Sequence, residues 1–203
     1  MSLPSLAPIP GLLQPLATRA EQSWRAAVAG LEGGYGLDDW SPERWSAFSR
    51  VSAASDFFIE QSLRDPLMLL ELARSGELDR TFAPGELCGQ IAAAAQAATS
   101  DDELGRALRR QRTRQQVRII WRDINRQADL IETCRDLSDM ADACIDQAYR
   151  WLYQGLHRLD FPTLVEHPLL RDITVILLSV LGLVLTLTGC VLGWRRMTKR
   201  SAN

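Results

Sequence analysis

The chain has 203 residues, a formal net charge of −2 and four cysteines. Residues 1–170 hold 18 arginines and 24 acidic side chains, whereas residues 171–203 hold five basic side chains and one acid. Because the larger part is mildly acidic, we do not expect nucleic acid as a partner. The cysteines have no metal-ligand spacing, which argues against a zinc site or a disulfide framework and favours a reducing cytoplasm for residues 1–170.

A short leader precedes the first helical pattern. Residues 1–18 contain prolines but no lysine or arginine, so the positive end of a signal peptide is missing and we expect a disordered leader. Apolar residues then recur at helical spacing over Leu16–Leu31, and Gly33-Gly34 is expected to end this helix. Ser41-Pro42-Glu43 combines an N-cap, a proline at the first helical position and an early acid, which predicts a helix through about Ala54.

The remaining soluble part is also predicted to be helical. Four helices are expected at Asp56–Leu63, Pro66–Gly76, Pro84–Ala98 and from the capping box Ser100-Asp-Asp-Glu103 to about Arg126. The last and longest helix carries an apolar face in steps of three or four: Leu130, Cys134, Leu137, Ala141, Cys144, Ala148, Trp151 and Gly155. Roughly 150 residues in six or seven helices can bury a real core, so we predict an all-α fold, a soluble helical bundle.

The segment from Ile173 to Trp194 has 22 consecutive uncharged residues. At about 1.5 Å of rise per residue it makes about 33 Å of helix, enough to cross a bilayer core of about 30 Å. We therefore predict one C-terminal transmembrane helix, with a buried core helix as the alternative. Within it, Gly189 and Gly193 form a GxxxG pair, which would let two helices pack closely in a homodimer.

These patterns divide the chain into a leader (1–18), a helical domain (19–160), a linker (161–172), the membrane helix (173–194) and a basic tail (195–203). The basic tail favours a cytoplasmic C-terminus, which would put the helical domain outside. The absence of a signal pattern favours a cytoplasmic helical domain instead. A join of two unrelated segments at about 155–172 would explain the conflict, and the orientation stays open.

Arginine is the most unusual feature of the sequence. Eight arginines lie between residues 106 and 126, and five of them follow one another in steps of four. One interpretation pairs this stripe with acids of the next helix: Asp129, Glu132, Asp136, Asp139 and Asp142. The other makes it a binding face for an anion or an acidic partner, because the guanidinium fork fits phosphate and carboxylate. The candidate binding residues are Arg110, Arg114, Arg118 and Arg122.

No catalytic or metal-binding residue is predicted. His157 and His167 have no partner at catalytic or metal-ligand spacing. The acid pair Glu77/Asp79 lacks the phosphate-gripping loop that two-metal phosphoryl transfer needs. The acids of the run Asp101–Glu103 are explained by helix capping.

Three segments carry a resemblance to a known family. They are Ser55-Asp-Phe-Phe58 followed by Asp65-Pro66, the arginine-rich run Leu108–Asp123, and Leu137–Ala143 followed by Trp151-Leu152. In this order they resemble the N-terminal helical region of the bacterial glutamine synthetase adenylyltransferase, also called the adenylyl-removing enzyme. The resemblance covers about residues 24–153. The tail from Asp172 to Arg196 is similar to the terminal membrane helix of PepSY-associated inner-membrane proteins.

The first resemblance implies a large cytoplasmic enzyme with two nucleotidyltransferase halves. Such an enzyme uses ATP and magnesium to attach AMP to a tyrosine of glutamine synthetase, and it also removes this AMP. The nitrogen-regulatory PII protein controls the balance of the two reactions. Each half uses a Gly-rich loop followed by a Ser-Asp-x-Asp element, which these 203 residues do not contain. The sequence stops resembling the family near residues 155–162. No catalytic residue is therefore carried over, and no cofactor is assigned to this chain.

We therefore expect a truncated family member that is inactive alone. The alternative is a membrane-tethered interaction module that docks an acidic partner through its arginine-rich helix. A third interpretation, a small subunit of a membrane redox or transport complex, would need ligands in the membrane segment, and none is present.

Overall fold

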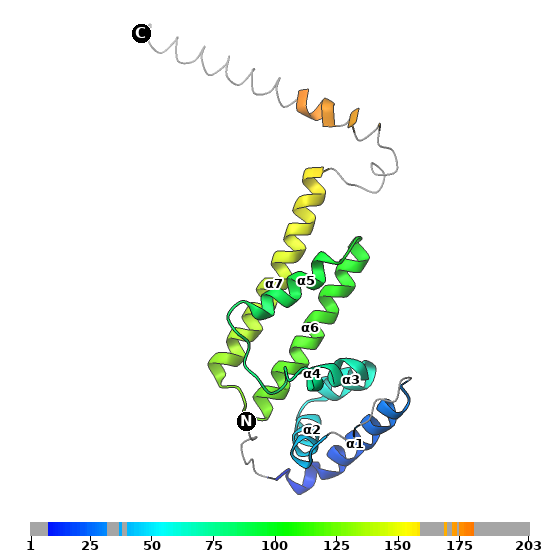
Figure 1. Cartoon of the computed structure of the whole chain (residues 1–203), viewed down its shortest axis with the longest axis vertical. Helices are drawn as coiled ribbons and strands as arrows, with labels where there is room; N and C mark the ends of the chain where they lie inside the picture. The colour runs from blue at the N-terminus through cyan, green and yellow to red at the C-terminus, as the bar shows by residue number, and fades with distance from the viewer. Residues whose placement is uncertain are drawn as a thin grey trace, which may run out of the picture. The chain divides into compact units, whose positions relative to one another are not determined.

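The computed structural model describes residues 8–31, 37, 40–158, 169, 172–173 and 175–180. All regular structure in these ranges is helical, which confirms the predicted all-α class for them (Figure 1). A 3-10 turn, η1 (Gly11–Leu13), precedes the α-helices. These are α1 (Gln14–Ala29), α2 (Pro42–Ala54), α3 (Asp56–Arg64), α4 (Pro66–Arg74), α5 (Glu86–Gln96), α6 (Asp101–Ile124) and α7 (Leu130–Arg158). The chain divides into two units, Met1–Ala148 and Tyr149–Asn203, which are described separately.

Local capping explains where four helices begin. The side chains of Ser41, Ser55, Asp65 and Ser100 each accept a hydrogen bond from the amide three residues later, at 3.2 to 3.3 Å. Each bond satisfies one of the amides that a helix N-terminus leaves without a partner. Glu103 also reaches back and accepts from the Thr99 amide at 2.8 Å. The predicted starts of α2, α3, α4 and α6 are therefore confirmed.

Other helix boundaries differ from the prediction. α1 begins at Gln14, inside the segment expected to be a disordered leader. α5 begins at Glu86 rather than at the preceding proline, because Gly85 takes a left-handed conformation with φ of 79°. α6 ends at Ile124, and Arg126 has φ of 53°, so the chain reverses there. The amides of residues 127 and 128 then return to the Arg122 carbonyl, at 2.8 and 3.3 Å.

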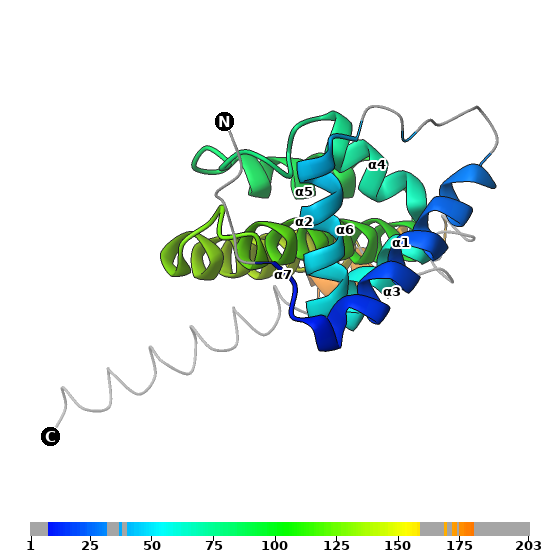
Figure 2. The same ribbon diagram turned by 90° about the horizontal axis from the view of Figure 1, so that it is seen from below.

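The first unit is built around α6. Figures 1 and 2 show α1 to α4 gathered beside its C-terminal half, with α2 crossing it, and α5 beside its N-terminal half. A run of aromatic rings links these helices: Trp24 to Phe48, Phe48 to Phe58 and Phe58 to Trp121, with centroids 5.7, 5.9 and 6.0 Å apart. All four rings are fully buried. Such contacts add to the burial of large apolar surfaces and fix the helices that carry the site.

A second, smaller core joins α5 to α7. Its members are Phe82, Leu87, Ile91, Met140 and Ala143. The apolar face predicted for α7 is wrong over its first half: Leu130, Cys134, Leu137 and Ala141 are all exposed. Asp136 is buried instead, where it pairs with Arg118 of α6. The ion pair of Asp136 and the apolar contacts of Met140 and Ala143 therefore set the rotation of α7 together.

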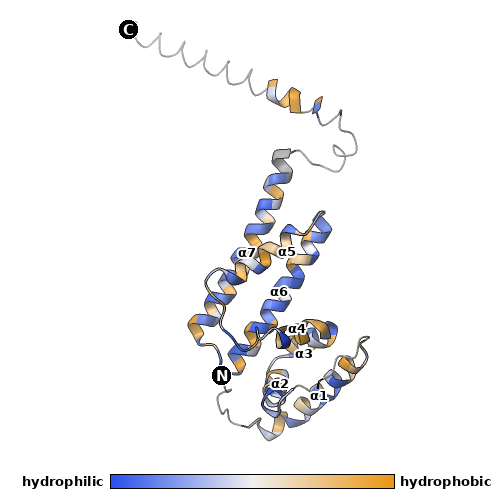
Figure 3. Ribbon diagram, in the orientation of Figure 1, coloured by the Kyte–Doolittle hydropathy of each residue, from blue (hydrophilic) through white to orange (hydrophobic). Residues whose placement is uncertain are grey.

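The second unit contains the end of α7 and a few further helical residues. The rings of Tyr149 and Tyr153 stack there with centroids 5.8 Å apart. Residues 175–180 are helical and exposed, and all but Ser179 are apolar (Figure 3). In the described part of the chain, no helix has both the length and the apolar character needed to span a bilayer. Most of the predicted membrane helix 173–194, including Gly189, Gly193 and Trp194, lies outside the described residues, as do the basic tail and most of the linker.

Candidate functional site

The arginines of α6 divide between the interior and the surface. From Leu104 to Arg122 the helix holds seven arginines and no acid. A step of four residues advances about 40° beyond a full turn, so a stripe with this spacing winds around the helix. The exposed fraction of the side chain accordingly falls from 63% at Arg110 to 16% at Arg114, 0% at Arg118 and 3% at Arg122. The four candidate residues therefore do not form one face.

Arg118 lies at the centre of the buried group. It donates to Asp136 Oδ2 on α7 at 2.8 Å, to the Glu77 carbonyl at 3.0 Å and to the Arg80 carbonyl at 2.7 Å. Its guanidinium also stacks on the Phe82 ring, 3.5 Å from the centroid. Burial lowers the pKa of Arg118, and the hydrogen bond to Asp136 opposes that change. A guanidinium keeps its charge in such surroundings, so this is a buried ion pair with further hydrogen bonds.

Arg122 repeats the arrangement one turn later. It donates to Glu132 Oε1 at 2.9 Å, to the Thr81 hydroxyl at 3.1 Å and to the Gln127 carbonyl at 3.1 Å. Glu132 also accepts from Thr81 at 3.0 Å. The group therefore ties the start of α7 to the loop between α4 and α5, residues 75–85.

Arg114 completes the buried series at its outer end. It contacts Glu71 at 3.3 Å and Glu77 at 3.1 Å. We call Arg114, Arg118 and Arg122 the arginine clamp, because together they hold α4, the α4–α5 loop and α7 against α6. The intramolecular-pairing interpretation is confirmed for the clamp, with Glu132 and Asp136 as the partners supplied by α7. Asp129, another proposed partner, instead caps α7 by accepting from the Glu132 amide at 2.7 Å.

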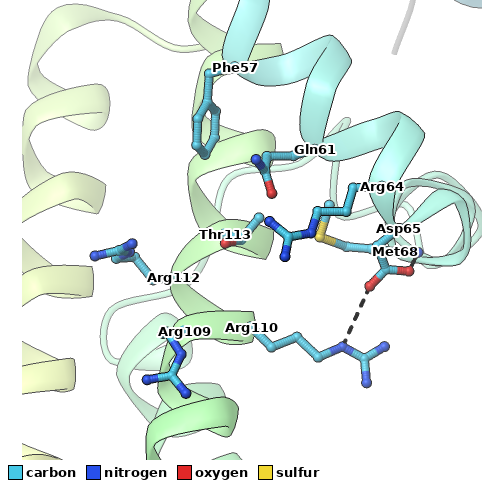
Figure 4. A pocket seen from close by; sticks show the side chains of 9 residues that line it. All are labelled: Phe57, Gln61, Arg64, Asp65, Met68, Arg109, Arg110, Arg112 and Thr113. Atoms are coloured by element: carbon cyan, nitrogen blue, oxygen red, sulfur yellow. Dashed lines mark hydrogen bonds and ion pairs between the residues drawn. The ribbon is translucent and has the colours of Figure 1, made fainter.

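Arg110 belongs to a different site, an open groove of about 530 Å³ between α3 and α6 (Figure 4). We call it the basic groove; it is lined by Phe57, Gln61, Arg64, Asp65, Met68, Arg109, Arg110, Arg112 and Thr113. Asp65 is the only acid among these residues, and its Oδ2 lies 3.9 Å from Arg110 Nε. Both side chains are more than one third exposed, so this ion pair is weak. The groove therefore keeps a strong excess of positive charge.

Sequence reasoning missed three of the four arginines in the basic groove. Arg109 and Arg112 belong to the same arginine-rich run but fall outside the spacing of four, and Arg64 comes from the end of α3. The missed signal is the absence of any acid over Leu104–Arg122, which leaves more arginines than the acids of α7 can pair.

Metal ligation and thiol chemistry have little support in the described part of the chain. No group of three or more His, Cys, Asp or Glu residues there is placed to hold a metal ion. Cys88, Cys134 and Cys144 are free thiols. Burial raises the pKa of Cys88 and of Cys144, which makes both thiols less reactive. His167 and the side chain of His157 lie outside what the structure describes.

Comparison with known proteins places this helical chain in a family. The model of the glutamate-ammonia ligase adenylyltransferase family matches residues 45–182, more than half of the chain. The chain therefore belongs to this family, and the predicted resemblance of its N-terminal region is confirmed. The match extends through residues 161–172, the predicted linker or join. The resemblance of the tail to PepSY-associated proteins stays a prediction.

Several curated relatives carry the same description, bifunctional glutamine synthetase adenylyltransferase/adenylyl-removing enzyme. The relative from Pseudomonas syringae pv. tomato is 64% identical over 155 residues, which is 75% of this chain and 16% of the relative. Those from Pseudomonas putida and Pseudomonas aeruginosa are 59% and 56% identical, over 75% and 76% of this chain and 16% of each relative. The chain thus spans about one sixth of the length of these proteins. No solved structure matches it significantly.

Proposed function

We propose that this chain is a non-catalytic helical region that acts in the regulation of glutamine synthetase by adenylyl transfer. The observation that carries the proposal is the 64% identity, over three quarters of the chain, to a bifunctional glutamine synthetase adenylyltransferase/adenylyl-removing enzyme. Glutamine synthetase and the PII protein are the proposed partners. ATP and magnesium would act in the catalytic halves of a complete enzyme, and no residue of this chain is assigned to either.

The acidic side chains that could have bound metal ions form ion pairs and hydrogen bonds within the chain, which supports a non-catalytic role. Glu77 pairs with Arg114 at 3.1 Å, and Asp79 is held by Arg44. Glu103 is occupied by the backbone at the start of α6. Two-metal phosphoryl transfer needs carboxylates that are free to bind metal ions beside the phosphates. These acids stabilise helices and loops instead.

A transfer assay tests the proposal directly. The purified chain is incubated with glutamine synthetase, magnesium and ATP labelled in its α-phosphate, with the full-length Pseudomonas syringae relative as the positive control. We expect labelled glutamine synthetase only with the relative. A direct binding measurement then asks whether the chain alone associates with glutamine synthetase or PII. AMP transfer by the chain, abolished by substitution of one of its acids, would refute the non-catalytic role. Failure to bind either protein would refute the assignment of partners.

A second candidate is a membrane-tethered interaction module, favoured by the uncharged run 173–194 and the exposed arginines of the basic groove. It places the helical domain in the cytoplasm on a single-pass anchor, with Gly189 and Gly193 at a dimer contact. Membrane fractions of cells that express the chain, washed with alkaline carbonate, test the anchor against a version cut after residue 160. If both versions stay in the soluble fraction, the tethering idea fails. Reporter fusions at both ends determine the orientation.

A further inference from the structure

We propose that the basic groove binds a polyphosphate group, as in inorganic triphosphate or a nucleoside triphosphate. Four arginines and one acid line the groove, so three positive charges have no counter-charge in its wall. Guanidinium groups hold phosphate oxygens through paired, charge-assisted hydrogen bonds. A volume of about 530 Å³ also falls within the range of sites that bind small molecules.

The arginines of the groove differ from those of the arginine clamp because none of them is held in a buried ion pair. Arg114, Arg118 and Arg122 are all taken up by carboxylates. Within the described part of the chain, Arg64, Arg109 and Arg112 form no ion pair, and Arg110 has only its long contact to Asp65. Lining one groove with four arginines and a single carboxylate is electrostatically unfavourable. A bound polyanion would relieve this repulsion.

The groove is held in shape by helices that the core fixes. α3 and α6 are joined behind it by the contact of Phe58 with Trp121. The guanidinium groups therefore start from fixed backbone positions, which lowers the ordering cost of binding. Gln61 and Thr113 add uncharged hydrogen-bond donors among the arginines (Figure 4).

A compact ligand fits the charge distribution better than an acidic protein segment. The groove gathers four arginines and one acid, whereas the whole chain has a net charge of −2. An extended acidic partner would reach beyond the groove onto a domain with 18 arginines and 24 acids over residues 1–170, whose net negative charge repels it. A polyphosphate places three or four negative charges within the groove itself. Phe57 lies at the end of the groove away from Arg109 and Arg110, where a nucleobase can stack (Figure 4).

Calorimetric titration of the full chain tests the site, with inorganic triphosphate and ATP as probes. The double variant Arg109→Gln/Arg112→Gln removes two unpaired guanidinium groups and is expected to weaken binding of both probes by about tenfold or more. Arg19→Gln removes the same kind of charge from the exposed surface of α1 and is the matched control, with an expected change of less than twofold. Asp65→Asn should change affinity in the opposite direction.

The Asp65→Asn variant is informative because it separates charge from structure. Asp65 caps α4 by accepting from the Met68 amide at 3.2 Å, and asparagine preserves such a cap. The variant therefore keeps the fold, removes the only negative charge of the groove and frees Arg110. We expect triphosphate to bind about threefold more tightly. An unchanged melting temperature for every variant shows that differences in binding do not come from unfolding.

Three results would overturn the proposal. The first is that neither probe binds at 1 mM, which is about the weakest useful affinity for a small-molecule site. The second is that the double variant and the Arg19→Gln control bind the probes equally well, and the third is that an Asp/Glu peptide binds more tightly than triphosphate. The two probes distinguish the source of the polyphosphate. Tighter binding of ATP, lost in Phe57→Ala, supports a nucleotide. Equal binding of both probes supports the inorganic chain.

Discussion

Replacing Arg118 by methionine should destabilise the helical unit by about 3 kcal/mol. The substitution leaves Asp136 buried without its closest partner and removes donors from the Glu77 and Arg80 carbonyls. Breaking a buried ion pair on one side costs about 3–5 kcal/mol. The lower end applies because Asp136 keeps a contact with Arg135 at 3.5 Å. At about 2–4 °C per kcal/mol, the melting temperature should fall by about 10 °C.

Urea unfolding followed by tryptophan fluorescence measures this loss, since Trp24 and Trp121 are fully buried. The double variant Arg118→Met/Asp136→Leu should recover about half of the lost stability, because it leaves no unpaired charge. Arg110→Met is the matched control, and its loss should stay below about 0.5 kcal/mol because its pair with Asp65 is exposed. The reasoning is refuted if Arg118→Met costs less than about 1 kcal/mol. It is also refuted if the losses of stability from Arg118→Met alone and Asp136→Leu alone simply add in the double variant.

Two further predictions concern acid stability and a turn. The Arg80 guanidinium and the Ala83 amide lower the pKa of Glu86 from 4.5 to about 2. A group whose pKa is lower in the folded state stabilises the fold at pH values above its unfolded-state pKa. This contribution is therefore complete above about pH 4.5 and is lost as the pH falls to 2. Glu86→Gln should flatten the plot of melting temperature against pH over this range, while Glu60→Gln should not. Arg126 has φ of 53°, a conformation that glycine adopts without strain. Arg126→Gly should therefore raise the free energy of unfolding by up to about 1 kcal/mol in urea titrations, whereas a gain from Arg126→Ala would contradict this explanation.

Helix starts could be predicted from the sequence because their signals are local. Ser41, Ser55, Asp65 and Ser100 each bond an amide three residues away, so no distant part of the chain is needed. The rotation of α7 could not be predicted in the same way. The first half of its predicted apolar stripe points outward, while Asp136 and Glu132 contact arginines on α6, 18 and 10 residues away. Periodicity counts apolar residues, but it does not weigh two buried ion pairs against them.

The candidate site was only partly predictable for a related reason. The spacing of four selected Arg110, Arg114, Arg118 and Arg122 as candidates for a binding face. The winding of that stripe carries it from the surface into the interior, so three of the four arginines hold the fold together and one lines the basic groove. Arg64 reaches the groove from α3, and no pattern within α6 could indicate it.

The arginine clamp also determines which changes the α4–α5 loop can tolerate over evolution. Arg118 and Arg122 hold this loop mainly through carbonyl oxygens, those of Glu77, Leu78 and Arg80. Every residue has the same backbone carbonyl whatever its side chain. Substitutions at many loop positions should therefore leave these hydrogen bonds intact. An insertion or deletion of one residue, however, would move every carbonyl away from its guanidinium. Among related chains that keep these arginines, the length of the loop should vary less than its sequence.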